Sequence, residues 1–251
     1  MAEAIKVALA DGRELPRPGV LCTVAKVTGS GPSSFGTKMY VGSDRFVGTI
    51  GGGEFERLVL EHARGVLSGR GKSGLKEFAL CRASGQCCGG RMEVLFEMMP
   101  KDKSLVIYGA GHVGRALAEI LSGTPLRVSV VDARGQWARE LPKDVETVLA
   151  DPVGHAQARS WTSHDAAAII THSHELDLEL AKTLLQTKAG YLGMIGSEHK
   201  AEVFAARLGG ELAQAWEARM KCPVGWRLEG KNPKLIALAI AAELLRDWWP
   251  N

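Results

Sequence analysis

This sequence of 251 residues has few of the features that mark membrane or nucleic-acid-binding proteins. Its longest apolar run, Leu235 to Leu245, contains Glu243 and is much shorter than the roughly 20 residues of a membrane span. Lys and Arg number 31 against 28 Asp and Glu, and this net charge of +3 is too small to predict binding to nucleic acid. The composition, 45% hydrophobic and 24% charged, excludes global disorder.

Export signals and a disulfide framework are missing too. The N-terminal stretch MAEAIKVALADGREL carries early charges and no apolar core, so it predicts a cytoplasmic protein rather than a secreted one. The five cysteines are an odd number, which argues against a disulfide framework. Cys22 lies in an apolar run and is expected to be a small buried hydrophobe. Because G-x-S-x-G, HExxH and Walker motifs are absent, these hydrolase, metalloprotease and NTPase sites are not predicted.

The chain divides into two halves that differ in pattern. Residues 1–99 predict a small α+β domain, 100–104 (PKDKS) a linker, and 105–251 a larger domain. In the first half, helices are expected over 2–10 and 54–67, and strands over 19–28, 37–42, 45–50, 75–80 and 91–98.

The second half alternates between strand and helix patterns. Strands are expected over 105–109, 127–132, 145–150, 167–171 and 190–195. Helices are expected over 112–122, 153–160, 175–187, 198–208 and 233–249. This alternation predicts an α/β fold with a Rossmann-like, doubly wound parallel sheet and helices on both faces. Asn232 is expected to cap the last helix, with Pro233 in its first position.

The glycine-rich loop after the first strand of this half predicts an anion site. Gly109, Gly111 and Gly114 form G-x-G-x-x-G between an apolar strand and an amphipathic helix, the context of a dinucleotide-binding loop. Asp132 ends the next strand, where such folds place the acid that bonds a ribose hydroxyl. A packing turn is the alternative. His112 is interpreted either as a ligand contact or as a cap of the helix start.

Two loops of the first half carry further candidate residues. Gly51, Gly52 and Gly53 lie between an expected strand and an expected helix. They are interpreted either as a second anion cradle of unpaired N–H groups or as a packing turn. In SGQCCGG, Gln86 precedes Cys87 and Cys88, whose spacing is not that of a zinc site. Their flanking glycines suggest accessible thiols suited to sulfur chemistry or to contact with a soft metal centre; the alternative is a turn with incidental cysteines.

More polar residues are expected at the carboxyl edge of the parallel sheet. His172 follows the fourth strand, and a hydrogen bond to a ligand is favoured over a metal pair with His174; Ser173 is expected to cap a helix. Ser197 lies in another glycine turn (193–198) that leads into a helix at this edge, and Lys200 beyond it is expected to be solvated. Ligands of open α/β sheets bind along this edge.

Taken together, these motifs are similar to the XdhC/CoxI family of molybdenum-cofactor chaperones. The similar segments are the glycine triplet at 51–53, GQCCGGRMEVLFE, IYGAGHVGRALA, VVDAR, THSHELDLEL, YLGMIGS and CPVG…GKNP…IALAIAAELL, and they extend over nearly the whole chain. Glu54 stands where the CoxI branch has a cysteine, which favours the xanthine-dehydrogenase branch.

This resemblance implies a function that composition alone does not give. Such proteins bind the molybdenum cofactor (molybdopterin), hold it while a cysteine desulfurase supports its sulfuration, and help insert it into xanthine dehydrogenase or a related molybdenum hydroxylase. They are not enzymes, and a homodimer is expected. Our hypothesis is that Cys87 or Cys88 and the 51–53 loop face molybdenum across a crevice between the domains. An NAD(P)-dependent oxidoreductase, with a nicotinamide or adenine nucleotide in the Rossmann crevice, and a thiol-based redox or metal sensor remain as alternatives.

Overall fold

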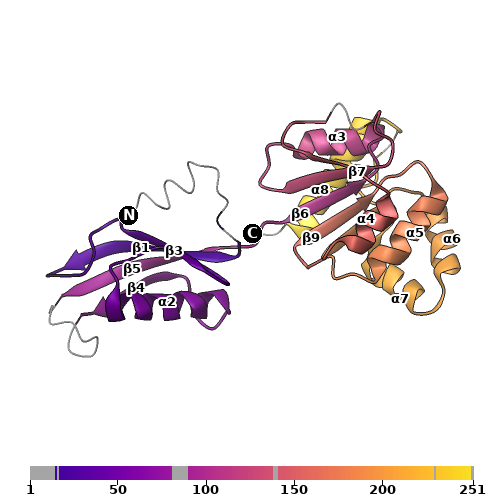
Figure 1. Cartoon of the computed structure of the whole chain (residues 1–251). Coiled ribbons are helices and arrows are strands. Elements are labelled where there is room, and N and C mark those ends of the chain that lie inside the picture. The colour runs from indigo at the N-terminus through magenta and orange to yellow at the C-terminus, as the bar shows by residue number, and fades with distance from the viewer. Residues whose placement is uncertain (1–14, 16, 81–89, 138–140, 229, 250–251) are drawn as a thin grey trace. The chain divides into compact units, whose positions relative to one another are not determined.

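The computed structural model describes residues 15, 17–80, 90–137, 141–228 and 230–249. The chain divides into two compact units, Met1–Lys101 and Asp102–Asn251 (Figure 1). The helix expected over residues 2–10 lies outside the described residues.

The first unit is a five-stranded antiparallel sheet in the order β3-β2-β1-β5-β4 with one described helix packed against it. Its elements confirm the expected pattern: β1 Gly19–Thr28, β2 Lys38–Gly42, β3 Phe46–Gly48, α2 Gly53–Leu67, β4 Gly74–Ala79 and β5 Arg91–Met99. In β1, Val20, Cys22 and Val24 alternate with less buried residues, because successive side chains of a strand point to opposite faces. Cys22 is buried, as expected.

The core of this unit lies between α2 and the sheet. Phe55, Val59, Ala63 and Val66 recur at intervals of three and four residues, so they form one buried face of α2. The Phe55 ring meets the Phe78 ring edge-on, with centroids 5.7 Å apart. Burial of these aromatic rings anchors the helix on the strands.

The second unit is a six-stranded parallel sheet in the order β11-β10-β9-β6-β7-β8. Its strands are β6 Ser104–Tyr108, β7 Arg127–Asp132, β8 Glu146–Leu149, β9 Asp165–Ile169, β10 Tyr191–Met194 and β11 Met220–Lys221. Its helices are α3 His112–Leu121, α4 Pro152–Ala158, α5 His174–Leu185, α6 Glu198–Leu208, α7 Gly210–Arg219 and α8 Pro233–Trp248.

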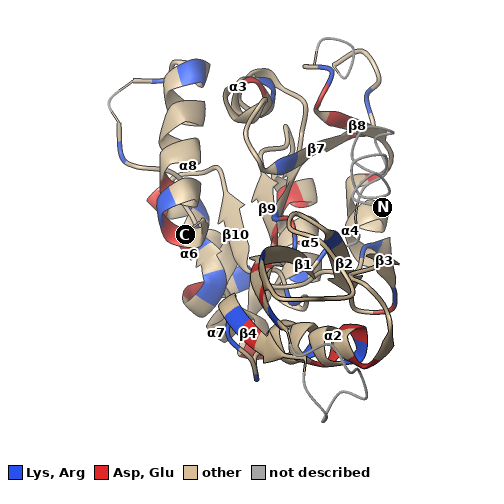
Figure 2. Cartoon of the chain, turned by 90° about the vertical axis from the view of Figure 1, so that its left-hand side faces the viewer, with Lys and Arg blue, Asp and Glu red and all other residues tan. Residues whose placement is uncertain are grey.

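Two cores cover the two faces of this sheet, which confirms the doubly wound Rossmann-like fold. Leu105 and Ile107 of β6 face the core that contains α3 and α8, while Val106 and Tyr108 face the core that contains α4 to α7 (Figure 1). Asn232 caps α8, as predicted, through bonds from Lys234 N and Leu235 N. Figure 2 shows the charged residues of α8 near its two ends. No helix of the described residues is long and apolar enough to span a membrane.

Part of the second unit differs from the predicted pattern. β9 begins two residues before the expected position because Asp165, a polar residue, is buried at its start, where it accepts bonds from Ser104 Oγ and Thr162 N. Helix α7 and strand β11 were not predicted. Gly209 separates α6 from α7 with a φ of +61°, a conformation that glycine readily adopts.

Candidate functional site

The loops after β6 and β9 meet at the carboxyl edge of the parallel sheet. The chain leaves β6 toward β7 on one side, and it continues from β9 toward β10 on the other, so the strand order reverses between these two neighbours. A Cβ on Gly109, whose φ is +117°, would lie 2.2 Å from the Ile170 carbonyl oxygen. Gly109 is therefore required by the contact between the two loops, at the place where open α/β sheets bind ligands.

The other two glycines of the loop have different surroundings. A Cβ on Gly114 would lie 1.9 Å from the carbonyl oxygen of Gly109, so this glycine lets α3 pack against the loop. Gly111 has a φ of −65°, which any residue adopts, and a Cβ there would meet nothing within 4 Å. The protein's own packing does not require a glycine at position 111, where the missing side chain leaves open space beside the helix start.

The start of α3 has no internal anion. Its N-cap is Gly111, which makes no side-chain cap, and its first turn contains no acidic residue. Among the described helices, every other one has a side-chain cap or an acidic residue in its first turn. The backbone N–H groups and the dipole at this end favour a negative charge. Among the described residues, the Asp132 carboxylate bonds Ala110 N, one residue before the N-cap, and no side chain caps the first turn itself.

His112 does not cap the helix, so that alternative is wrong. It is the first residue of α3, it is exposed, and its ring lies edge-on to Trp137 with centroids 5.4 Å apart. The guanidinium groups of Arg134 and Arg115 lie 5.6 and 6.0 Å from the centroid of the same indole ring. A contact between His112 and a ligand stays a prediction.

Asp132 lies beside this loop, but its carboxylate is already occupied by the protein. Its Oδ2 accepts from Ala110 N at 2.8 Å and from Arg134 Nη2 at 2.8 Å. Its Oδ1 accepts from the backbone N and the Nε of Arg134, each at 2.9 Å. Burial alone would raise the pKa of Asp132, but these hydrogen bonds outweigh it and lower the pKa to about 2.

A buried ion pair lies at the neighbouring part of the carboxyl edge of the sheet, and it shows that the expectation for Lys200 is wrong. Lys200 is 9% exposed rather than solvated, and its Nζ donates to Asp177 Oδ2 at 2.6 Å and to Ile195 O at 2.9 Å. Thr171 donates to the other oxygen of Asp177 at 2.6 Å. The pair joins the first turns of α5 and α6. The nearby Cys222 thiol has a pKa raised to about 11 by burial, so it is protonated at neutral pH.

The remaining predicted residues of this edge lie on its surface. Ser173 caps α5, as expected, by accepting a bond from Leu176 N. Ser197 caps α6 by accepting from Lys200 N, so its hydroxyl already has a structural task. His172 and His174 are exposed. Within the described part of the chain, no group of three or more His, Cys, Asp or Glu side chains is arranged to hold a metal ion.

The glycine triplet of the first unit has a carboxylate of the protein beside it, which occupies part of the expected anion cradle. The carboxylate of Glu56 accepts from Ile50 N at 3.0 Å, from Gly52 N at 3.3 Å and from the Thr49 hydroxyl. Gly51 N donates to Thr49 Oγ1 at 3.2 Å. All three glycines have a positive φ, and a Cβ on Gly51 would lie 2.8 Å from Pro32 O. These facts favour the packing turn.

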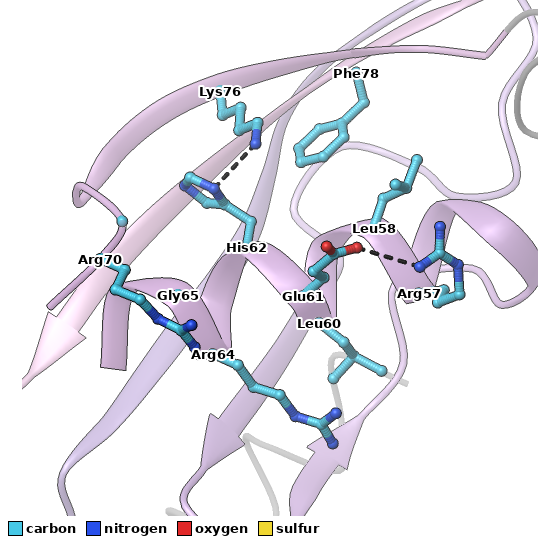
Figure 3. A pocket seen from close by; sticks show the side chains of 11 residues that line it. Arg57, Leu58, Leu60, Glu61, His62, Arg64, Gly65, Arg70, Lys76 and Phe78 are labelled. Atoms are coloured by element: carbon cyan, nitrogen blue, oxygen red, sulfur yellow. Dashed lines mark hydrogen bonds and ion pairs between the residues drawn. The ribbon is translucent and has the colours of Figure 1, made fainter. Parts of the chain in front are cut away.

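Gln86, Cys87 and Cys88 lie outside the described residues, so their predicted role is not tested. The described parts of the chain contain at least two cavities. One of about 770 Å³ lies between α2 and β4 and is lined by residues such as Arg64, Arg70 and Lys76, none of which the sequence singled out (Figure 3). The other, of about 690 Å³, follows β10 and includes Ser197 in its wall.

Comparison with known proteins identifies the family. A model of the XdhC Rossmann domain matches residues 105–244, and a model of the XdhC and CoxI family matches residues 13–79. The chain belongs to the XdhC and CoxI family. The predicted resemblance is confirmed, and the Rossmann-like second unit coincides with the family's Rossmann domain.

Two curated relatives and one solved structure are similar to this XdhC-family chain. The uncharacterized protein YqeB of Escherichia coli (strain K12) is 29% identical over 91% of the chain, and a probable xanthine dehydrogenase subunit of Bacillus subtilis (strain 168) is 26% identical over 59%. The chain spans 43% of each relative's length. A crystal structure of a xanthine dehydrogenase from Bacillus halodurans matches with a TM-score of 0.52 at 18% identity, covering 96% of this chain and 94% of that one. This last likeness shows the fold alone.

Proposed function

We propose that this chain is an accessory protein of xanthine dehydrogenase or a related molybdenum hydroxylase. It binds the molybdenum cofactor without consuming it, holds it for sulfuration with a cysteine desulfurase, and helps insert it into the apo-enzyme. Membership of the XdhC and CoxI family supports this role, as does the likeness to a B. subtilis protein named for xanthine dehydrogenase.

The observation that carries the proposal is the start of α3. It lacks a side-chain cap and an acidic residue in its first turn, and a Cβ at Gly111 would meet nothing within 4 Å, which supports the placing of an anion beside the helix start. A molybdopterin carries a phosphate, which fits N–H donors at a helix start. The residues present therefore fit the phosphate end of the cofactor.

The roles of individual residues follow from this fit. The first-turn N–H groups of α3 bind the phosphate, and Gly111 leaves room for it. Gly109 and Gly114 hold the loop in the geometry that directs these donors outward. When bound, the cofactor supplies a soft metal centre, which favours thiolate ligands. Cys87 and Cys88 are the residues that we propose as its neighbours.

A loading experiment tests this function. The purified chain is incubated anaerobically with molybdenum cofactor, separated from free cofactor and denatured, and the fluorescent pterin released is measured. We expect pterin release, and reduced retention or reduced activation of apo-xanthine dehydrogenase by the Cys87→Ser/Cys88→Ser variant. Cys22→Ala, a buried cysteine of β1, is the control and should retain the cofactor.

The possible outcomes separate the candidate functions. Unchanged retention and activation by the double variant would remove the two thiols from the mechanism while leaving cofactor binding intact. Absence of pterin together with sustained NADH oxidation by a carbonyl substrate would support the oxidoreductase alternative. Stoichiometric zinc without pterin would support the thiol sensor.

A further inference from the structure

The Asp132 carboxylate has no capacity left for a ribose. In dinucleotide-binding folds, the acid at the end of the second strand accepts hydrogen bonds from ribose hydroxyls. A carboxylate offers about four acceptor positions. Here the four bonds from Ala110 and Arg134, all between 2.8 and 2.9 Å, occupy them. Asp132 is 6% exposed, so a ribose would have to displace these partners to reach it.

Arg134 is held by this carboxylate in a way that leaves donors for a ligand. Its Nε and Nη2 bind Asp132, and the structure gives its Nη1 no acceptor among the described residues. The side chain is 31% exposed, so it is partly open to solvent. Asp132 lies next to Ala110 of the glycine loop, so Arg134 lies close to the start of α3.

The surroundings of Arg134 add positive charge rather than hydroxyl acceptors. Its guanidinium and that of Arg115 both lie against the Trp137 ring. A guanidinium presents paired donors that match phosphate oxygens. A phosphate monoester carries about −1.5 to −2 charges at neutral pH, more than a diester does, so this patch favours the monoester.

We propose that Arg134, positioned by Asp132, binds a phosphate monoester of the ligand, and that this arrangement excludes ligands that need Asp132 as a ribose acceptor, NAD(H) above all. The inference rests on the proposed function only in taking the α3 start as the place where the ligand binds. A phosphate monoester is present both as the terminal phosphate of molybdopterin and as the 2′-phosphate of NADP(H). Arg134 thereby sets the ligand class of the site.

Two matched ligand pairs test the proposal on the full chain. NADP⁺ and NAD⁺ differ by one phosphate monoester, as do molybdopterin and phosphatase-treated molybdopterin; affinities are measured anaerobically by calorimetry or by retained pterin. We expect at least one phosphorylated ligand to bind about tenfold or more tightly than its dephosphorylated counterpart. Arg134→Gln should abolish most of that difference, and Arg134→Lys should retain part of it because the charge remains.

Arg246→Gln is the matched control. Arg246 also pairs with a carboxylate, that of Asp247. It lies near the carboxyl end of α8, where the Trp248 carbonyl oxygen accepts a hydrogen bond from Lys103 Nζ. Lys103 precedes the amino end of β6, whereas the glycine loop follows the other end of this strand. This variant should keep the wild-type affinities. Thermal unfolding verifies that each variant is folded. If Arg134→Gln does not fold, the comparison rests on Arg134→Lys, which keeps a cation beside Asp132.

The outcomes distinguish this inference from the proposed function. A preference for NADP⁺ without binding of molybdopterin would uphold the inference and refute the cofactor role. Molybdopterin binding that is insensitive to phosphatase treatment and to both Arg134 substitutions would overturn the inference and leave the cofactor role standing. Equal binding within both ligand pairs, or binding of no phosphorylated ligand, would also overturn it.

Discussion

Gly111 and Gly114 are three residues apart, but substitution by alanine should affect different properties at the two positions: stability at Gly114 and cofactor retention at Gly111. In Gly114→Ala, the new Cβ would lie 1.9 Å from the Gly109 carbonyl oxygen, which is backbone and cannot rotate away. Overpacking of this kind typically costs about 1–3 kcal/mol and occasionally more, so we expect a loss of about 2–4 kcal/mol in the free energy of unfolding. For a unit of this size, the corresponding fall in Tm is roughly 4–16 °C.

In Gly111→Ala, the new Cβ meets nothing within 4 Å, and the backbone already has a φ that alanine adopts. The loss of a favourable N-cap residue and the reduced freedom of the unfolded chain oppose each other, so the free energy of unfolding should change by less than about 1 kcal/mol. The methyl group enters the space that we assign to phosphate, so retention of molybdenum cofactor should fall about tenfold or more.

Urea unfolding and anaerobic cofactor retention, measured on both variants, provide the comparison. If Gly111→Ala destabilised the protein as much as Gly114→Ala, position 111 would be required for packing, contrary to our expectation. If Gly111→Ala left cofactor retention unchanged, the open space at this position would not hold the ligand.

Three further predictions concern single interactions. Lys200→Met leaves Asp177, which is 1% exposed, without its cation and should lower the free energy of unfolding by about 3–5 kcal/mol. The double variant with Asp177→Leu should recover much of this loss, whereas a loss below about 1 kcal/mol in Lys200→Met would contradict the buried pair. Glu56→Ala leaves the N–H groups of Ile50 and Gly52 without their carboxylate acceptor and should cost about 1–3 kcal/mol in the free energy of unfolding, measured in urea. The exposed control Glu61→Ala should cost less than about 1 kcal/mol, and equal costs would show that the Glu56 carboxylate does not bind this loop. Asp132 has a pKa of about 2 in the folded protein against an ordinary value of 3.8, so its ionised form stabilises the fold by about 2 kcal/mol. This stabilisation is present above about pH 4 and is lost as the pH falls toward 2. The free energies of unfolding of the wild type and Asp132→Asn, measured in urea across this range, should therefore converge at the acid end, and a constant difference would contradict the assignment.

Patterns within a short stretch of sequence were sufficient to predict the fold. β6, the glycine loop and α3 follow one another in the chain, and their apolar periodicity and glycine spacing arise from local geometry. The caps at Ser173 and Asn232 were predictable for the same reason, because a capping side chain binds an N–H group two or three residues away.

Partners that are distant in sequence account for most of what was missed. Lys200 is buried because Asp177 lies on the preceding helix, and no local pattern joins residues 23 positions apart. Glu56 has the pattern of an ordinary acid at a helix start, but the chain reverses at the glycine triplet and brings the Ile50 N–H to it. Asp132 was identified as a site residue, yet its saturation depends on the conformation of the Arg134 side chain, which the sequence does not specify.

The central claim is that the edge of the parallel sheet beside α3 holds a phosphate-bearing molybdenum pterin. The most direct test is anaerobic incubation of the purified chain with molybdenum cofactor, followed by measurement of bound molybdenum and pterin per chain for the wild type and for Gly111→Ala. We expect stoichiometric binding by the wild type and a marked loss in the variant. Absence of bound molybdenum and pterin in the wild type, together with turnover of a nicotinamide substrate, would contradict it.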